Sequence, residues 1–413
     1  LEEKTYELNK KLDGVLSHSL GYGHNAAADH ITFSYETTQV PRIVTLWQAR
    51  YPFGHSLLQA STRAVPHEQV EIPISIKVNE RALQIAVDSV SEAMELYFEL
   101  NERYPKDIQD NMYVTPIGLL TNNSLTSSAR GLWQMFTDSK YNFIPNCIKR
   151  TSDAVYNLMY RFYPFAFKEW KSNYLSLMFH PTGTDFLAPY TNKEKYFSKY
   201  SDRKNNPELY LSPERPVILL EKPSGDPSVI LERFDNDLTH PLFHSGINLF
   251  QHKLAARIDI SIMHQMIRHR TIPQNYEPFI EAAMRIKEAF KKGELIEDHF
   301  VFPPTLETEH ENLKKSYLKS LNAFIKLIKE ENIPPQEALF VLPHGMVLQL
   351  EFVLDGWGAM HFTNERLCIT AKPGAREFAK NVRKVVKEAG SSLFELMAPK
   401  CEHLNYCPEG KKK

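Results

Sequence analysis

The sequence is organised around residues 264–273, which read His264-Gln265-Met266-Ile267-Arg268-His269-Arg270-Thr271-Ile272-Pro273. Upstream apolar residues, among them Ile258 and Ile262, recur at helical spacing and predict the end of an amphipathic helix. Gln265 and Arg268 are three positions apart and would share one face of that helix. Because proline cannot continue a helix, the break is expected just after Arg270.

Two arginines and a histidine at a stiff helix end suit the binding of a polyanion or of the carbonyl edge of a flavin. Arginine offers rigid bidentate forks, and histidine offers a donor that depends on protonation. The alternative is a solvated helix end whose basic groups meet the last carbonyls. The motif alone leaves both interpretations open.

The chain has 413 residues, which predicts two or three domains with ample core. A net charge of -1 gives no argument for nucleic-acid or membrane binding. No apolar run approaches a membrane span, and no signal peptide is visible. The sequence begins with Leu1, which leaves open whether N-terminal residues are missing. The four cysteines are scattered, so a reducing cytoplasm is expected.

The pattern along the chain predicts α/β (α+β) architecture in two halves. Strands are expected at 31–35 and 217–220, and a helix at 42–50. Three longer amphipathic helices are expected around 86–100, 279–290 and 313–328, with Gly293 closing the second. Polar residues crowd together between Tyr200 and Pro216, which suggests a boundary between domains 1–205 and 206–413.

The two halves are expected to be copies of one plan. Each has a helix ending in arginine, then long helices, then a Pro-x-Gly turn and a second helix with polar residues. The turns are Pro116-Ile117-Gly118 and Pro343-His344-Gly345. A period this long predicts duplication of a whole domain, each copy a mixed sheet with long packed helices.

The chain resembles the flavin-dependent thymidylate synthases. It is more similar to the long members of that family, in which two copies of the domain are fused. That family's fingerprint is Arg-His-Arg followed by Ser-x-Arg, with Gly-His and Glu-His upstream and Asn-Ala-Arg and a helical arginine downstream. The first half keeps Gly23-His24, Asp29-His30, Ser61-Thr62-Arg63 and Ala129-Arg130. It has Arg50-Tyr51-Pro52 where the family has Arg-His-Arg, and Ser139 where the family has the helical arginine. The second half keeps Gln265, Arg268-His269-Arg270 and Arg366. It has Pro278 in place of the serine of Ser-x-Arg, and Asp355 and Trp357 in place of the asparagine and the arginine of Asn-Ala-Arg.

These complementary losses suggest that the two copies pool their remaining groups into one composite active site. The resemblance implies that His30, Arg130, Arg268, His269, Arg270 and His361 bind FAD. It implies that Ser61, Arg63, Gln265 and Arg366 bind the nucleotide, and that Arg366 and Arg268 act in catalysis. Because single-copy members assemble as four subunits, the fused chain is expected to form a homodimer. The alternative is that both halves are drifting and the retained residues are accidental.

The implied reaction is reductive methylation of dUMP to dTMP, with FAD as cofactor and NADPH and methylene-tetrahydrofolate as co-substrates. Asp355 would repel a phosphate, and His361 stands where asparagine is usual. These departures leave two alternatives: a flavin-dependent methyltransferase acting on another nucleotide, or a non-catalytic nucleotide- or flavin-binding homologue. No metal site is expected, because Cys401, His403 and Cys407 lack the spacing of a zinc site.

Overall fold

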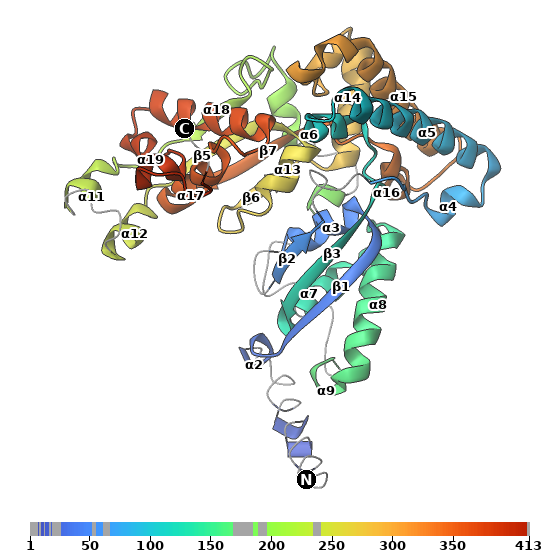
Figure 1. Cartoon of the computed structure of the whole chain (residues 1–413), viewed down its shortest axis with the longest axis horizontal. Helices are drawn as coiled ribbons and strands as arrows, with labels where there is room; N and C mark the ends of the chain where they lie inside the picture. The colour runs from blue at the N-terminus through green and yellow to red at the C-terminus, as the bar shows by residue number, and fades with distance from the viewer. Residues whose placement is uncertain are drawn as a thin grey trace. The chain divides into compact units, whose positions relative to one another are not determined.

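The computed structural model describes residues 26–51, 55–60, 67–167, 185–188, 196–233 and 241–410, and isolated positions between 7 and 18. The chain divides into two compact units (Figure 1). The first comprises Leu1–Ile108, Val114–Pro189 and Leu318–Pro343, and the second comprises Gln109–Tyr113, Tyr190–Tyr317 and His344–Lys413. The predicted boundary between residues 205 and 206 separates two copies of a sequence repeat, which is a different kind of division from these compact units. It stays a prediction.

The first unit contains an antiparallel sheet of three strands in the order β1-β3-β2. The strands are β1 (Thr32–Pro41), β2 (His55–Gln59) and β3 (Leu120–Ser128). In the central strand, Leu125 lies opposite Tyr35 on one side and Leu57 on the other. Strand β1 is longer than the predicted 31–35, because a register shift after Thr37 lets it keep pairing with β3 to Pro41.

Helices cover this sheet and complete the core of the first unit. Helices α3 (Arg42–Ala49), α7 (Ala129–Asp138) and α8 (Asn146–Phe162) pack on its strands. The first unit also contains the short helices α2 (Ala26–Asp29), α4 (Ile74–Lys77), α9 (Pro164–Phe167) and α16 (Pro335–Ala338). Figure 1 shows α8 alongside β1. All eight residues of α3 are buried, and Trp47 is wholly so. Helix α3 confirms the prediction for residues 42–50 to within one residue.

The predicted long helix is α5 (Glu80–Arg103). The side chain of Asn79 caps its N-terminus by accepting a hydrogen bond from Ala82 N at 3.0 Å. Ala86, Ala93, Tyr97 and Leu100 of the predicted apolar face are buried, which confirms that face. Burial of this stripe, and not helix propensity alone, stabilises an amphipathic helix.

The second unit contains a four-stranded antiparallel sheet in the order β4-β5-β7-β6. The strands are β4 (Val217–Glu221), β5 (His252–Asp259), β6 (Gln274–Tyr276) and β7 (Val347–Leu354). The β5 and β7 pair runs in register from His252 opposite Leu354 to Asp259 opposite Val347. The ends of these two central strands therefore lead directly into the helices that carry the predicted site.

The helices of the second unit are α13 (Ile260–Met266), α14 (Phe279–Lys291), α17 (Gly356–Arg366) and α18 (Pro373–Glu388), with the shorter α11 (Ser228–Arg233), α12 (Pro241–Ile247) and α19 (Lys400–Leu404). Two further helices, α6 (Ile108–Asn111) and α15 (His310–Lys329), each contain one of the chain positions at which the units divide. Gly293 has φ +80° just beyond α14, so it closes this helix as predicted.

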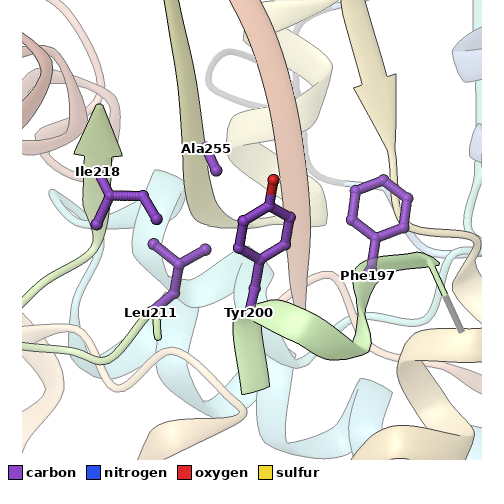
Figure 2. Packing of buried hydrophobic residues seen from close by; sticks show 5 residues of the cluster. All are labelled: Phe197, Tyr200, Leu211, Ile218 and Ala255. Atoms are coloured by element: carbon purple, nitrogen blue, oxygen red, sulfur yellow. The ribbon is translucent and has the colours of Figure 1, made fainter. Parts of the chain in front are cut away.

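A hydrophobic cluster covers part of the second sheet (Figure 2). Its members are Phe197, Tyr200, Leu211, Ile218 and Ala255. The phenol of Tyr200 also donates a hydrogen bond to Glu351, and the ammonium group of Lys199 lies 2.9 Å from the same carboxylate. The aromatic residues near position 200, which the sequence pattern left unassigned, thus fill the core of the second unit.

The prediction of mixed sheets is wrong for the described strands, because every strand pair among them is antiparallel. Hydrophobic periodicity predicts that a segment is a strand but carries no information about the direction of its neighbour. The α/β class itself is confirmed. No helix of the described residues is both long and apolar enough to cross a membrane.

Candidate functional site

The candidate site is built on α13, which begins directly after the central strand β5. The carboxylate of Asp259 caps the helix by accepting a hydrogen bond from Ile262 N at 2.8 Å. The helix ends at Met266, so the predicted continuation through Arg270 is wrong. Arg268, His269 and Arg270 lie in the turn between α13 and β6, and Arg268 does not share a helical face with Gln265.

The early end of α13 has a cause that lies downstream in the sequence. His269 N donates to Met266 O at 2.9 Å. The side-chain amide of Gln274 donates to Met266 O at 3.0 Å and to His269 O at 3.1 Å. These bonds satisfy carbonyl groups at the helix end and fix the turn. Gln274 therefore stabilises the conformation that holds the Arg-His-Arg motif.

Helix α17 supplies the other half of the site and begins directly after β7. Asp355 caps it by accepting a hydrogen bond from Gly358 N at 2.5 Å. Asparagine, aspartate and serine are equally good at this position, so the aspartate found where the family has asparagine keeps a capping role. The helix carries His361 on an exposed face and ends at the half-buried Arg366.

Arg366 joins the end of α17 to the turn after α13. Its Nε donates to His269 Nε2 at 3.0 Å, its Nη1 donates to Gln265 Oε1 at 3.0 Å, and its Nη2 donates to Gln265 O at 3.2 Å. All three acceptors are uncharged, so these bonds orient the guanidinium group without neutralising it.

His269 is 3% exposed, and its protonation state follows from its contacts. Because a guanidinium group can only donate, Nε2 of His269 must accept, and the neutral ring carries its proton on Nδ1. Burial, followed by the charge of Arg366, lowers the pKa of His269 to about 3. Nδ1 has no hydrogen-bond partner among the described residues. The site therefore offers a buried N–H donor that needs an acceptor.

Further basic groups surround this donor. Arg268 is exposed and Arg270 is half-buried. The pKa of Arg270 is lowered by burial and then by the charge of Arg268. The ring of His361 lies 5.2 Å from that of His269 in an edge-to-face arrangement. Positive charge beside a buried N–H donor suits an anionic ligand with carbonyl oxygens.

Two of the residues predicted for the site, His30 and Arg130, belong to the first unit. Arg130 Nη1 forms an ion pair with Asp29 at 2.8 Å, and His30 is exposed in the turn after α2. Ser128 caps α7 by accepting from Gly131 N at 3.1 Å. The predicted residues Ser61 and Arg63, and the Gly23-His24 motif, lie outside the described residues.

The position in the first unit that corresponds to Arg-His-Arg is bound to other groups of that unit. Arg50 makes two hydrogen bonds with Asp185, at 3.1 and 2.9 Å. The phenol of Tyr51 donates to Asp138 at 2.8 Å, and burial followed by the Asp138 charge raises its pKa. These contacts give Arg50 and Tyr51 a structural role in the first unit.

The sequence interpretation missed a buried polar cluster at the start of α13. Lys372 Nζ donates to Ser261 Oγ at 2.7 Å and lies 3.6 Å from the centre of the Tyr113 ring. Burial raises the pKa of Asp259 to about 6, and the charge of Lys372 opposes this rise. An aspartate before an apolar helical run signals an N-cap, but no local pattern identifies Lys372 as its neighbour.

The sequence matches one family model, described as "Thymidylate synthase complementing protein", over residues 232–389. Flavin-dependent thymidylate synthases are among the curated relatives. That of Pyrococcus abyssi is 28% identical over 153 residues, which are 35% of this chain and 59% of the relative. That of Sulfurisphaera tokodaii is 25% identical over 141 residues, which are 33% of this chain and 50% of the relative. The chain spans about half the length of the curated relatives it matches.

Among solved structures, a flavin-dependent thymidylate synthase from Helicobacter pylori, complexed with FAD and dUMP, aligns with 44% of this chain and 99% of its own. The sequence identity is 14% and the TM-score is 0.35. The residues matched by the family model, 232–389, include the Arg-His-Arg motif and Arg366. The family model and the curated relatives confirm the resemblance to the flavin-dependent thymidylate synthases for part of the chain, as a divergent and longer form.

Proposed function

We propose that this chain is a tandem flavin-dependent thymidylate synthase that methylates dUMP reductively to dTMP. FAD would be the cofactor, NADPH and methylene-tetrahydrofolate would be co-substrates, and the site of action would be the cytoplasm. The observation that carries the proposal is the buried Nδ1–H of His269, which lies beside Arg366 and Arg268 and has no acceptor among the described residues. A ring carbonyl of a flavin or a pyrimidine supplies both the acceptor and the planar shape that such a donor fits.

The two units support a duplicated origin through matching local structure. In each unit, one strand leads into a short helix and a second strand follows. A later strand lies between these two in the sheet and pairs with both. Gly118 N donates to Phe340 O at 3.1 Å in the first unit, and Gly345 N donates to Tyr113 O at 2.8 Å in the second. Gly345 and Phe340 lie 227 positions after Gly118 and Tyr113 respectively.

The same offset of 227 positions separates Ser128 from Asp355, the N-caps of α7 and α17. Two equivalent hydrogen bonds and two equivalent caps at one offset are what a duplication produces. We therefore assign the repeats to residues 1–205 and 206–413. In this proposal a homodimer of the fused chain contains four copies of the domain.

When bound, the flavin supplies redox chemistry that the protein side chains lack. The protein side chains would bind and orient the flavin and the nucleotide and would neutralise their negative charge. His269 would donate from Nδ1 to a ring carbonyl, while Arg366 and Arg268 stabilise negative charge that develops on the pyrimidine or flavin. His361, Arg270 and, from the first half, His30 and Arg130 would complete the cofactor contacts.

Nucleotide binding is assigned to residues from both halves. Ser61 and Arg63 would hold the phosphate with a hydroxyl group and a guanidinium group, and Gln265 and Arg366 would face the base. In the first half, Arg50 and Tyr51 are already bound to carboxylates. This favours one composite site for each pair of repeats over two equivalent sites.

The first experiment asks whether the purified full-length chain binds flavin. Visible absorption and fluorescence are recorded before and after addition of FAD. A flavin spectrum that persists after gel filtration supports the proposal, and its absence both as purified and after FAD addition overturns it. NADPH oxidation is then followed with dUMP and with other nucleotides. Stimulation by a different nucleotide alone would identify another methyltransferase, and flavin binding without any turnover would identify a non-catalytic homologue.

The composite site is tested by mixing two inactive variants, Arg63→Ala in the first half and Arg268→Ala in the second. If each site takes its residues from two chains, mixed dimers regain one intact site and part of the activity. If the site lies within one chain, both variants stay inactive after mixing. Full activity of the Arg63→Ala variant would show that the site does not include Arg63 of the first half.

A further inference from the structure

We infer that Trp357 and His361 form a shelf on α17 against which the isoalloxazine ring of a flavin stacks. This inference rests on the proposed function and deepens it. The family pattern has an arginine at position 357, so the contact made there by this chain would differ in kind. A guanidinium group pairs with charge and hydrogen-bond acceptors, whereas an indole offers a wide π face.

The exposure of Trp357 is the first observation. Its side chain is 40% exposed, whereas Trp47 and Trp133 are 0% and 2% exposed. A tryptophan left partly exposed on a helix makes a poor contribution to the core, but it is well suited to binding an aromatic ligand. Its backbone is nevertheless fixed, because Trp357 N donates to Asn248 Oδ1 at 3.1 Å.

The spacing of α17 places a second ring beside it. His361 is four residues after Trp357, so the two side chains lie on the same face of the helix. Both are exposed. The ring of His361 lies 5.2 Å from that of His269. The shelf therefore extends from Trp357 through His361 to the His269 ring, whose Nδ1–H donor has no partner in the part of the chain that the structure describes.

The first turn of α17 also lies against the basic turn itself. A Cβ atom at Gly358, the residue after Trp357, would come 3.2 Å from Ile272 Cγ1. Ile272 follows Arg270 by two positions, and Ile272 N donates to His269 O at 3.1 Å. The Trp357 end of the helix is thus in contact with the segment that holds His269.

The chemistry of the surroundings selects the occupant. A ligand suited to this surface has a π face that can cover the exposed part of the Trp357 indole, a carbonyl oxygen for His269 Nδ1–H, and negative charge near Arg268 and Arg270. A flavin nucleotide has all three, in its fused ring, its ring carbonyls and its phosphates. A single-ring pyrimidine nucleotide offers less area for stacking, since the gain from stacking follows the area of the π face that is covered.

The test uses the full-length protein and FAD as the probe. Binding is measured by flavin fluorescence for the wild type, Trp357→Ala, Trp357→Phe and the matched control Phe98→Ala. Phe98 is 38% exposed on α5 in the first unit. Loss of one stacking contact predicts a dissociation constant about tenfold higher for Trp357→Ala. Trp357→Phe should recover most of the affinity, and Phe98→Ala should match the wild type.

A second readout comes from tryptophan emission during the same titration. FAD should quench the emission of Trp357, seen as the difference between wild type and Trp357→Phe. If the wild type binds no FAD, both the proposed function and this inference fail. If Trp357→Ala binds FAD with wild-type affinity and Trp357 emission is unquenched, only this inference fails. Quenching by dUMP in the absence of FAD would assign the shelf to the nucleotide and overturn the flavin assignment.

Discussion

Arg366 Nε donates a hydrogen bond to His269 Nε2 at 3.0 Å, which connects the last residue of α17 to the turn after α13. This one contact fixes the tautomer of the histidine and therefore the direction of its remaining donor. The bond joins two segments that lie nearly 100 positions apart in the sequence.

Replacing Arg366 with lysine should disrupt the site while keeping the charge. A lysine cannot reproduce the fork that reaches His269 Nε2 and both oxygens of Gln265. We expect a loss of unfolding free energy of about 2 kcal/mol, because hydrogen bonds from charged donors are lost. FAD affinity should fall more than tenfold.

Urea unfolding and a flavin titration measure the two effects of this change. Arg376→Lys is the matched control, because the described contact of Arg376 is a single bond to Ile369 O at 3.2 Å on neighbouring α18. Equal FAD affinity in Arg366→Lys and wild type would show that the fork does not shape the binding site.

His269 should make the protein less stable in acid. Its folded-state pKa is about 3, below the value near 6.5 expected in the unfolded chain. The unfolded state therefore binds more protons between these values, and the stabilisation present above pH 6.5 is lost as the pH falls toward 3. Between pH 6.5 and pH 4 this one group accounts for up to about 3 kcal/mol.

The measurement is urea unfolding at several pH values for wild type and His269→Asn. Asparagine retains a polar side chain but does not titrate. The variant should be less stable at pH 7 and show a shallower loss of stability between pH 6.5 and pH 4. His299, whose pKa is also lowered to about 3 by burial, remains in both proteins as an internal reference. Parallel curves for the two proteins would contradict the assigned protonation state.

Local patterns predicted several helices and strands outside the site. The apolar stripe of α5, the strand at 217–221 and the stop at Gly293 depend on residues within one or two helical turns. The end of α13 was mispredicted, because Gln274 binds Met266 O from eight residues downstream. The pairing of Arg366 with His269 and of Lys372 with Ser261 spans about 100 residues. Helix periodicity carries no information about such contacts, and only the family resemblance pointed to Arg366.

Asp355 provides a test of whether its charge or its capping role matters. Its carboxylate accepts a hydrogen bond from Gly358 N, and burial raises its pKa. Asp355→Asn should keep the cap and restore the residue found in the family, with little change in stability. Asp355→Ala should cost about 1 kcal/mol through loss of the cap. Thermal unfolding measures both variants, and Ser128→Ala provides the equivalent change at α7. A greater loss with asparagine than with alanine would contradict the capping role.

Lys372 should stabilise the start of α13 in a way that depends on pH. Its ammonium group lies beside Ser261, Tyr113 and the buried carboxylate of Asp259. Asp259 has a folded-state pKa of about 6, above its value near 3.9 in an unfolded chain. The contribution of Asp259 to wild-type stability should therefore decline as the pH rises through this range. Without Lys372 the pKa rises further, and the decline continues to higher pH.

The variant Lys372→Met keeps the length of the side chain and removes the charge. At pH 8 it should lose about 3 kcal/mol of unfolding free energy, because a buried carboxylate is left without its compensating cation. At pH 5 the loss should be smaller, since Asp259 is then protonated in the folded state. Lys380→Met is the control on α18, the helix that begins directly after Lys372, because Lys380 is exposed and pairs with Glu377 at 3.2 Å. An equal loss at both pH values would mean that Lys372 acts through packing, and the electrostatic account of the α13 N-terminus would be wrong.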